Sequence, residues 1–428
     1  MLIFRLTKRV CIPSLLPLGS QVIHNSSFFL IKQIHLMQSP RIQEIEFTLF
    51  EFSIPNIVAD PSGFGVWYEP GVGTPQKRFG VRIFTDDGVV GEYVPPRARA
   101  AVLMSAGVAL AHALLNKPAL ERERHYQTMR RLTKHVGEAG IGALDIALWD
   151  IAGKCSGLSI AQMLGGHRWQ LPAYASTIAG DEQQGGLNHP EAYADFAESC
   201  LELGYPGFKM HGWKEGDPKR ESMMIQAVAE RVGGKMEVMY DAACHLKTLT
   251  DAIRVGKVCD ENDLLWYEDP YADGGLSFSG HKLLKKKIQT PIMIGEHVRT
   301  VETHTDLMIS GATDFGRVDP DYDGGITGCY KAAIAAEAMG IDVEVHSCGP
   351  AMRQLMATLS RSNYYEVNLV HPAAPNPWQL PIYRNGYSDE LDCINSDGMV
   401  GVSQSPGLGV DYDWDLIEKT KIDRVVVK

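Results

Sequence analysis

The feature of this 428-residue sequence that most constrains its fold is an alternation of short apolar runs with amphipathic segments after residue 169. Successive runs end roughly 20 to 34 residues apart, as the strands of strand–helix units do. We predict strands that end near Thr177, His211, Asp241, Glu268, Glu296, Asp319, His346 and Glu366. Eight such units predict an α/β protein with a parallel (β/α) barrel. A doubly wound open sheet is the alternative, but it would not gather every polar strand end around one mouth.

The residues before this repeat predict a separate domain of strands and helices. Residues 42–52 alternate as a strand does, and residues 78–93 form a hairpin around Asp86-Asp87-Gly88, a favoured turn sequence. Residues 97–132 are rich in Ala and Leu, and residues 140–153 carry apolar side chains at helical spacing. The chain therefore begins its folded part with an α+β domain and continues into the barrel.

A loop at residues 55–75 is rich in Gly and Pro but carries three aromatic side chains, Phe64, Trp67 and Tyr68. Aromatic residues on such a loop form either a lid that covers a substrate or a segment that packs onto its own domain. We regard these three residues as candidates for a substrate-specificity loop.

The composition excludes several classes of partner. The net charge of −11 argues against nucleic acid or an anionic membrane surface, because both require basic patches, whereas an anionic small molecule remains compatible if a metal meets it. No apolar run reaches the ~18 residues of a membrane-spanning helix. The eight cysteines are scattered without a Cys-x-x-Cys pair, which predicts reduced thiols and a cytoplasmic protein.

Residues 1–40 differ from the rest, since they contain basic residues and no acidic residue precedes Glu44. A mitochondrial-type targeting segment has this composition. An upstream start codon or cloned extra sequence, with Met37 opening the native protein, also gives it. We favour the second interpretation, because the dense Arg/Ser amphipathic pattern is missing, and predict that this extension is disordered or not native.

Three carboxylates end three consecutive predicted strands, at Asp241, Glu268 and Glu296. In a barrel they would be neighbours at the mouth, where they would repel one another and raise each other's pKa unless a cation neutralised them. Oxygen ligands with room for water or substrate suit Mg²⁺ best, with Mn²⁺ as a substitute. The sequence therefore predicts a Mg²⁺ site on these residues.

Five further side chains would surround this metal. Asp319 and His346 end adjacent strands, and a carboxylate behind an imidazole gives a base usable near neutral pH. Lys209 and His211 share one face of the second strand and would lie across the mouth from His346. Glu366 would either bond a substrate oxygen that gains charge or pair with a neighbouring cation. Two acid–base groups beside a divalent metal suit removal of a proton α to a carboxylate, with an enediolate stabilised by the metal.

Taken together, these residues resemble the enolase superfamily, in particular its mandelate racemase-like subgroup, over residues 42–428. The motifs that carry the resemblance are Ala143-Leu-Asp-Ile-Ala-Leu-Trp-Asp-Ile-Ala-Gly-Lys154, Tyr267-Glu-Asp-Pro270, Gly295-Glu-His297, Asp319 upstream of Gly324-Gly-Ile-Thr327, His346 and Glu366. The resemblance implies a modified TIM barrel, (β/α)₇β, at residues 169–390. It also implies an N-terminal α+β capping domain at 41–168, completed by a C-terminal segment at 391–428 that packs back on it.

The same resemblance assigns roles to the site residues. It implies Mg²⁺ on Asp241, Glu268 and Glu296, and an Asp319–His346 dyad as one acid–base group. It further implies that Lys209 faces the substrate carboxylate, that Glu366 bonds the enediolate, and that residues 55–75 form the specificity loop.

The sequence departs from the subgroup at one point, because Lys-x-Lys on the second strand is replaced by Lys209-Met-His211. A histidine also abstracts protons, so catalysis remains expected, with a changed pKa and reach at this position. Cys244, His245 and His297 add polar groups near the metal, and we expect them to be solvent-side loop residues.

The expected activity is Mg²⁺-dependent dehydration of a sugar acid, an aldonate or aldarate, to a 2-keto-3-deoxy acid. The alternative is a racemase or epimerase of a 2-hydroxy acid that uses the same two bases. A non-catalytic relative is the third reading. Relatives commonly form symmetric assemblies, so a homo-oligomer is expected.

Overall fold

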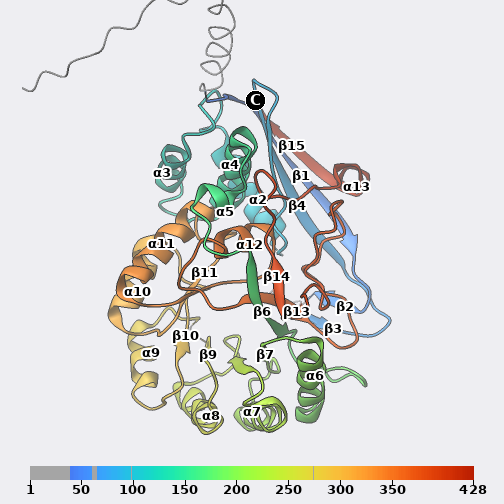
Figure 1. The fold of residues 1–428 in the computed structure, drawn as a ribbon, viewed down its shortest axis with the longest axis vertical. Coiled ribbons are helices and arrows are strands. Elements are labelled where there is room, and N and C mark those ends of the chain that lie inside the picture. The colour runs from blue at the N-terminus through green and yellow to red at the C-terminus, as the bar shows by residue number, and fades with distance from the viewer. Residues whose placement is uncertain (1–38, 60–64, 98, 273) are drawn as a thin grey trace, which may run out of the picture. The chain divides into compact units, whose positions relative to one another are not determined.

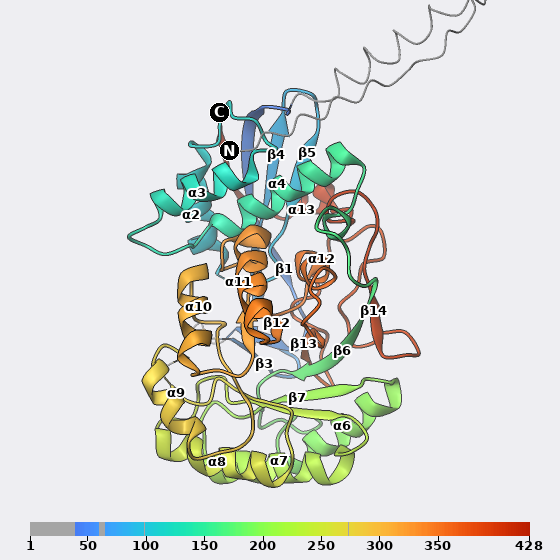
Figure 2. The same ribbon diagram turned by 60° about the vertical axis from the view of Figure 1, so that its left-hand side comes forward.

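The computed structural model describes residues 39–59, 65–97, 99–272 and 274–428 (Figures 1 and 2). The predictions made for residues 1–38 and for Phe64 lie outside these ranges. Within them, no helix has the length and apolarity needed to cross a membrane.

The first domain contains an antiparallel sheet of β1 (Ile42–Ser53), β4 (Pro75–Thr85), β5 (Val90–Tyr93) and β15 (Lys421–Val427). The strands lie in the order β15-β1-β4-β5; Figure 1 labels the first three and Figure 2 labels β5. The predicted hairpin is β4 and β5, and Gly88 in its turn takes a φ of 88°, which favours glycine. Strand β15 pairs with β1 from Ile45↔Val427 to Phe50↔Lys421, so the end of the chain completes this sheet.

Four helices accompany the sheet: α2 (Ala100–Ala111), α3 (Arg122–Leu132), α4 (Ile141–Ser156) and α5 (Ile160–Met163). Helix α4 is buried throughout Ile141 to Gly153, because it lies between the sheet and the barrel helix α11 (Gly325–Met339) (Figure 2). The close approach requires a glycine, since a Cβ at Gly91 would lie 2.2 Å from the carbonyl oxygen of Ala147. Trp149 Nε1 donates to Thr327 Oγ1 at 2.9 Å and fastens α4 to the barrel.

Eight strands form the barrel, and the prediction of a (β/α)₇β barrel with a capping domain is confirmed. The strands are β6 (Gln170–Thr177), β7 (Gly207–His211), β8 (Glu237–Asp241), β9 (Tyr267–Glu268), β10 (Ile292–Met293), β11 (Gly316–Val318), β12 (Val343–Val345) and β13 (Tyr365–Val370). The helices between them are α6 (Pro190–Leu203), α7 (Pro218–Val232), α8 (Leu249–Glu261), α9 (Phe278–Lys285), α10 (Val301–Ser310), α11 and α12 (Pro350–Met356).

The barrel strands run parallel in the order β10-β9-β8-β7-β6-β13, and β11 pairs with β12. Two links continue this order where the regular ladder is interrupted. A parallel bridge between Met293 and Phe315 joins β10 to the approach of β11. Beyond β12, the amide of Ser347 donates to Glu366 Oε2 of β13 at 2.7 Å.

A buried cluster inside the barrel comes from β6, β8 and β10 and from the residue before β9, and consists of Tyr174, Met239, Trp266 and Met293. The rings of Tyr174 and Trp266 pack edge to face, with centroids 5.6 Å apart. The barrel is therefore a packed core with its functional groups above it, as this architecture requires.

Candidate active site

The three predicted metal ligands come together at the mouth of the barrel. Asp241 and Glu268 end β8 and β9, whereas Glu296 lies three residues beyond Met293, where the short strand β10 ends. One carboxylate oxygen from each of the three lies within 4.8 Å of the other two. Gly295, with a φ of 149°, turns the loop back toward the mouth, and a Cβ there would lie 2.7 Å from the carbonyl oxygen of Arg317.

This carboxylate trio, Asp241, Glu268 and Glu296, fits a hard divalent cation. All the donor atoms are carboxylate oxygens, which is the ligand type that Mg²⁺ and Mn²⁺ take. Burial raises the pKa of Glu268 to about 7 against the opposing charges of Arg317 and Lys209. A divalent ion among these oxygens would therefore hold Glu268 in its ionised form.

Lys209 lies beneath the trio and does not face the cavity. Its side chain is 1% exposed, and its ammonium contacts three carboxylates. Nζ lies 2.6 Å from Glu268 Oε2, 2.9 Å from Glu366 Oε1 and 3.2 Å from Asp241 Oδ2. This position differs from the expected contact with a substrate carboxylate, and it makes Lys209 a buried counter-charge.

A second buried cation, Arg317, was missed by the sequence reasoning. Its side chain is 0% exposed, with Nε 2.9 Å from Glu268 Oε1 and Nη2 2.7 Å from Glu366 Oε2. Strand alternation could have found it, because Arg317 precedes Asp319 by two residues and so faces the same side. Burial alone would raise the pKa of Glu366, but Arg317 and Lys209 hold it well below its usual range.

Glu366 was predicted at the end of the eighth strand, and this position is wrong. Strand β13 runs from Tyr365 to Val370, so Glu366 is its second residue. The prediction stopped the strand too early because Glu366 was taken as a polar strand end. Glu366 nevertheless lines the mouth cavity, and its carboxylate lies beside the Lys209 ammonium.

The Asp319–His346 pair lies directly after strands β11 and β12. His346 Nδ1 is 2.8 Å from Asp319 Oδ2, and His346 Nε2 is 2.9 Å from Glu296 Oε2. Burial and the charge of Arg97 lower the pKa of His346, but Glu296 and Asp319 outweigh them and the net direction is upward. The imidazole therefore lies between a positioning carboxylate and the trio.

Arg97, from the loop after β5, brings the capping domain into this site. Its Nη1 donates to Asp319 Oδ2 and lies 2.8 Å from His346 Nδ1. Its guanidinium also stacks over the Tyr322 ring, 5.2 Å from the centroid. The sequence reasoning missed Arg97, because nothing in its local pattern indicates that it crosses to the other domain.

His211 flanks the opposite end of the trio. Its Nε2 is 2.9 Å from Asp241 Oδ2, and its Nδ1 is 2.7 Å from the carbonyl oxygen of Thr177. The Tyr193 hydroxyl donates to the carbonyl oxygen of His211 at 2.5 Å, which fixes the strand end. Burial lowers the pKa of His211, but Asp241 outweighs it and the net direction is upward.

A cavity of about 440 Å³ opens above these groups. Its described lining includes the trio members Asp241 and Glu296 together with Arg97, Arg99, His211, His245, His297, Arg299, Tyr322, His346, Glu366, Asn368 and Trp378. The cationic and imidazole groups outnumber the carboxylates, which favours an anionic ligand.

The aromatic loop contributes to this cavity differently from the prediction. Gly65 and Val66 belong to the described lining, and Trp67 and Tyr68 do not. Both aromatic residues lie on β3 (Val66–Tyr68), which pairs with β2 (Ile57–Ala59). Trp67 packs under the Lys214 ammonium, 4.8 Å from it, and the Tyr68 ring lies 4.3 Å from the ring of His371.

The loop after β7 rests on a buried acid, Glu221 of α7, which gives a testable pH dependence. Glu221 accepts hydrogen bonds from the Trp213 amide at 2.9 Å and the Tyr240 hydroxyl at 3.0 Å. Burial raises the pKa of this carboxyl to about 7. The folded state therefore holds the proton more tightly than the unfolded state, and the associated stability is lost as pH rises from about 4.5 to about 7.

We expect Glu221→Gln to remove this dependence. Relative to the variant, the wild type should lose roughly 2 to 4 kcal/mol of unfolding free energy between pH 4.5 and pH 7.5. Urea unfolding of the wild type and the variant at both pH values measures this change in unfolding free energy. If the unfolding free energies of the two proteins differ by the same amount at both pH values, Glu221 is not a buried carboxyl with a raised pKa.

The fold and the mouth define a class of protein, the capped barrels that hold a carboxylate trio between two imidazoles at the mouth. Residues 72–165 match the mandelate racemase/muconate lactonizing enzyme N-terminal domain, and residues 192–416 match the enolase C-terminal domain-like family. The chain belongs to the mandelate racemase/muconate lactonizing enzyme family of the enolase superfamily.

Several relatives cover most of the chain. It is 27% identical to D-galactarolactone cycloisomerase of Agrobacterium fabrum, over 80% of this chain and 90% of that protein. It is 26% identical to L-talarate/galactarate dehydratase of Salmonella typhimurium, over 70% of this chain and 71% of that protein. Among solved structures, D-glucarate dehydratase from Agrobacterium tumefaciens, complexed with magnesium, matches with a TM-score of 0.79 and 26% identity, over 90% of this chain and all of that one.

Proposed function

We propose that this protein dehydrates a sugar acid, removing the proton α to the carboxylate and then the β-hydroxyl. The observation that carries the proposal is the pair of imidazoles at the two ends of the trio, His211 on Asp241 and His346 on Glu296. A proton abstraction followed by loss of a hydroxyl requires a base and then an acid, and these imidazoles can supply both roles, together or through one ring in turn. The dehydratase names of several relatives support the same reaction.

The trio would hold Mg²⁺, which supplies positive charge for the substrate carboxylate as its α-carbon loses a proton. This positive charge is needed because the proton on a carbon next to a carboxylate is only weakly acidic. The surrounding cations, Arg97, Arg99 and Arg299, line the cavity and would attract and orient the anionic substrate.

His346 is the group we assign to proton abstraction. With its Nδ1 proton donated to Asp319, a neutral His346 would present its Nε2 lone pair to the α-proton of the substrate, in place of the contact that Nε2 makes with Glu296. Asp319 then stabilises the imidazolium, while Arg97 keeps Asp319 ionised. The imidazolium returns its proton to the β-hydroxyl, which leaves as water, and the enol product tautomerises to a 2-keto-3-deoxy acid.

His211 would act from the other end of the trio. Its Nδ1 proton points to the Thr177 carbonyl oxygen, so Nε2 would be the reactive nitrogen once it exchanges its contact with Asp241 for one with the substrate. The same arrangement would serve a racemase or epimerase, in which one imidazole removes the proton and the other returns it. That is the second candidate function, and the two imidazoles are the observation that favours it.

Turnover of a sugar-acid library in D₂O with Mg²⁺ tests both functions. A 2-keto product indicates dehydration, whereas deuterium at C2 with inversion and retained oxygen indicates racemisation. If no aldonate or aldarate in a broad library gives a product or exchanges its C2 proton, both proposed functions are refuted.

Metal removal should abolish turnover. EDTA treatment followed by desalting is expected to reduce activity to background, and added Mg²⁺ should restore it, because three adjacent carboxylates cannot stabilise further negative charge without a cation. The measurement is the initial rate against added Mg²⁺. Full activity in metal-free protein would contradict the role of the trio.

A further inference from the structure

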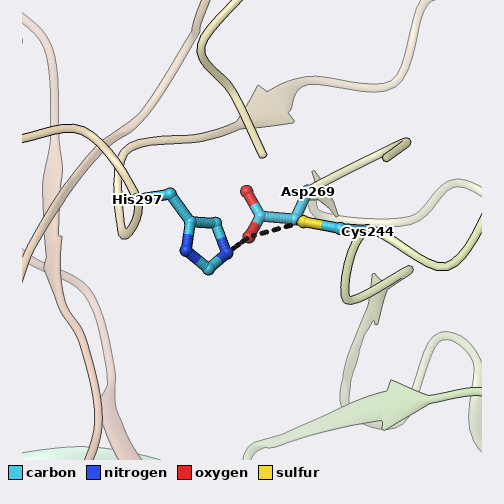
Figure 3. A group of neighbouring side chains, drawn as sticks. All are labelled: Cys244, Asp269 and His297. Carbon is cyan, nitrogen blue, oxygen red and sulfur yellow. Dashed lines mark hydrogen bonds and ion pairs between the residues drawn. The ribbon is translucent and has the colours of Figure 1, made fainter. Parts of the chain in front are cut away.

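Three side chains outside the proposed reaction converge beside the trio: Cys244, Asp269 and His297 (Figure 3). They follow β8, β9 and β10, each within three residues of one trio member. A thiol sulfur, a carboxylate oxygen and an imidazole nitrogen from these residues lie within 4.8 Å of one another. Cys244 and His297 were expected to be solvent-side loop residues, yet their side chains point toward Asp269.

The spacing of these atoms suits a metal ion. His297 Nε2 lies 3.0 Å from Asp269 Oδ2, and Cys244 Sγ lies 3.8 Å from the same oxygen. Figure 3 shows the thiol and the imidazole both directed at this carboxylate. Around tetrahedral zinc, with bonds of about 2.3 Å to sulfur and about 2.0 Å to nitrogen or oxygen, ligand atoms lie about 3.3 to 3.6 Å apart. The thiol sulfur and the imidazole nitrogen lie within 4.8 Å of each other, so a bound ion would draw them together by up to about 1 Å and displace the shared protons.

The environment of Asp269 favours the binding of a cation. The residue is 1% exposed, and its Oδ1 has no hydrogen-bond partner in the described part of the chain. A buried carboxylate with an unsatisfied oxygen is costly, and a bound cation offsets that cost. His297 also lines the mouth cavity, which gives an ion a path to the cluster.

The donor atoms separate this cluster from the trio. The trio offers only carboxylate oxygens, whereas the cluster offers one sulfur, one nitrogen and one oxygen. Thiolate and imidazole ligands select zinc-like transition metals and disfavour Mg²⁺. Three protein ligands leave a fourth tetrahedral position for water.

We propose that Cys244, Asp269 and His297 form a second metal site, which binds Zn²⁺ or a similar thiophilic divalent ion beside the trio. The ion ties together the loops after β8, β9 and β10, each of which lies next to one trio residue. The site does not depend on the dehydration reaction, since none of its ligands takes part in the proton transfers.

Cobalt binding in the presence of excess Mg²⁺ tests the site directly. Mg²⁺ fills oxygen-ligated positions, and Co²⁺ bound to a thiolate gives a sulfur-to-cobalt charge-transfer band in the near ultraviolet. We expect the wild-type protein to develop this band and to saturate at about one equivalent of Co²⁺. Zn²⁺ should displace the cobalt and abolish the band, in keeping with the donor set.

The ligand variants decide between this site and other thiols. Cys244→Ser should lose the band, and His297→Gln should keep the thiolate but bind Co²⁺ at least about tenfold more weakly. Cys155→Ser, which removes an exposed thiol on α4, is the matched control and should keep the band unchanged. The proposal is overturned if the wild type gives no band or if Cys155→Ser alone removes it. Circular dichroism establishes that each variant is folded, and His297→Gln decides the question if Cys244→Ser does not fold.

Discussion

Replacing His346 by Asn is expected to lower kcat for sugar-acid dehydration by about 10²- to 10⁴-fold, the usual contribution of a positioned acid or base. Asn keeps a polar side chain of similar reach next to Asp319 and Glu296 but cannot accept and return a proton. The measurement is steady-state turnover with saturating Mg²⁺, together with Mg²⁺ affinity by calorimetry. The affinity should remain close to that of the wild type, because the trio is intact.

Two further measurements separate the possible roles of His346. If it removes the α-proton, His346→Asn should lose deuterium exchange at C2 along with product formation. If it acts only as the acid, exchange should persist through His211 while product formation stops. His125→Asn, which changes a buried imidazole of the capping domain, is the matched control and should leave turnover unchanged. Wild-type turnover in His346→Asn would refute the Asp319–His346 assignment.

Except for the end of β13, the strand ends were predictable because the pattern is local. Each short apolar run before a polar residue marks a strand, and parallel strands in a barrel must present their carboxyl ends together. Asp241, Glu268 and Glu296 therefore converge as the spacing indicated. Asp319 and His346 become neighbours for the same reason, since their strands pair in parallel.

The sequence pattern could not predict how deep each side chain lies in the barrel or which residues of one domain contact the other. Alternation places Lys209 and His211 on one face, and both indeed contact Asp241, but it does not say that Lys209 lies below the carboxylates and His211 at the rim. Arg97 reaches Asp319 from another domain, so its role depends on the tertiary arrangement. Cys244 and His297 likewise converge on one carboxylate only because three loops fold together.

Changing Lys209 to Met should destabilise the protein by about 3 to 5 kcal/mol in the absence of metal, because it leaves buried carboxylates without their shared cation. Asp241, Glu268 and Glu366 would then face one another with Arg317 as the remaining buried counter-charge. Mg²⁺ should restore part of the loss, since the ion adds positive charge beside Asp241 and Glu268. Urea unfolding with and without Mg²⁺ measures both effects.

A matched substitution and a kinetic measurement distinguish this role from a contact with substrate. Lys219→Met removes an exposed ammonium at the start of α7 and should change stability by no more than about 0.5 kcal/mol. If Lys209 bound the substrate carboxylate, Lys209→Met would raise KM and leave the unfolding free energy near that of the wild type. A large, Mg²⁺-sensitive loss of stability instead follows from an ammonium that touches three carboxylates and no solvent.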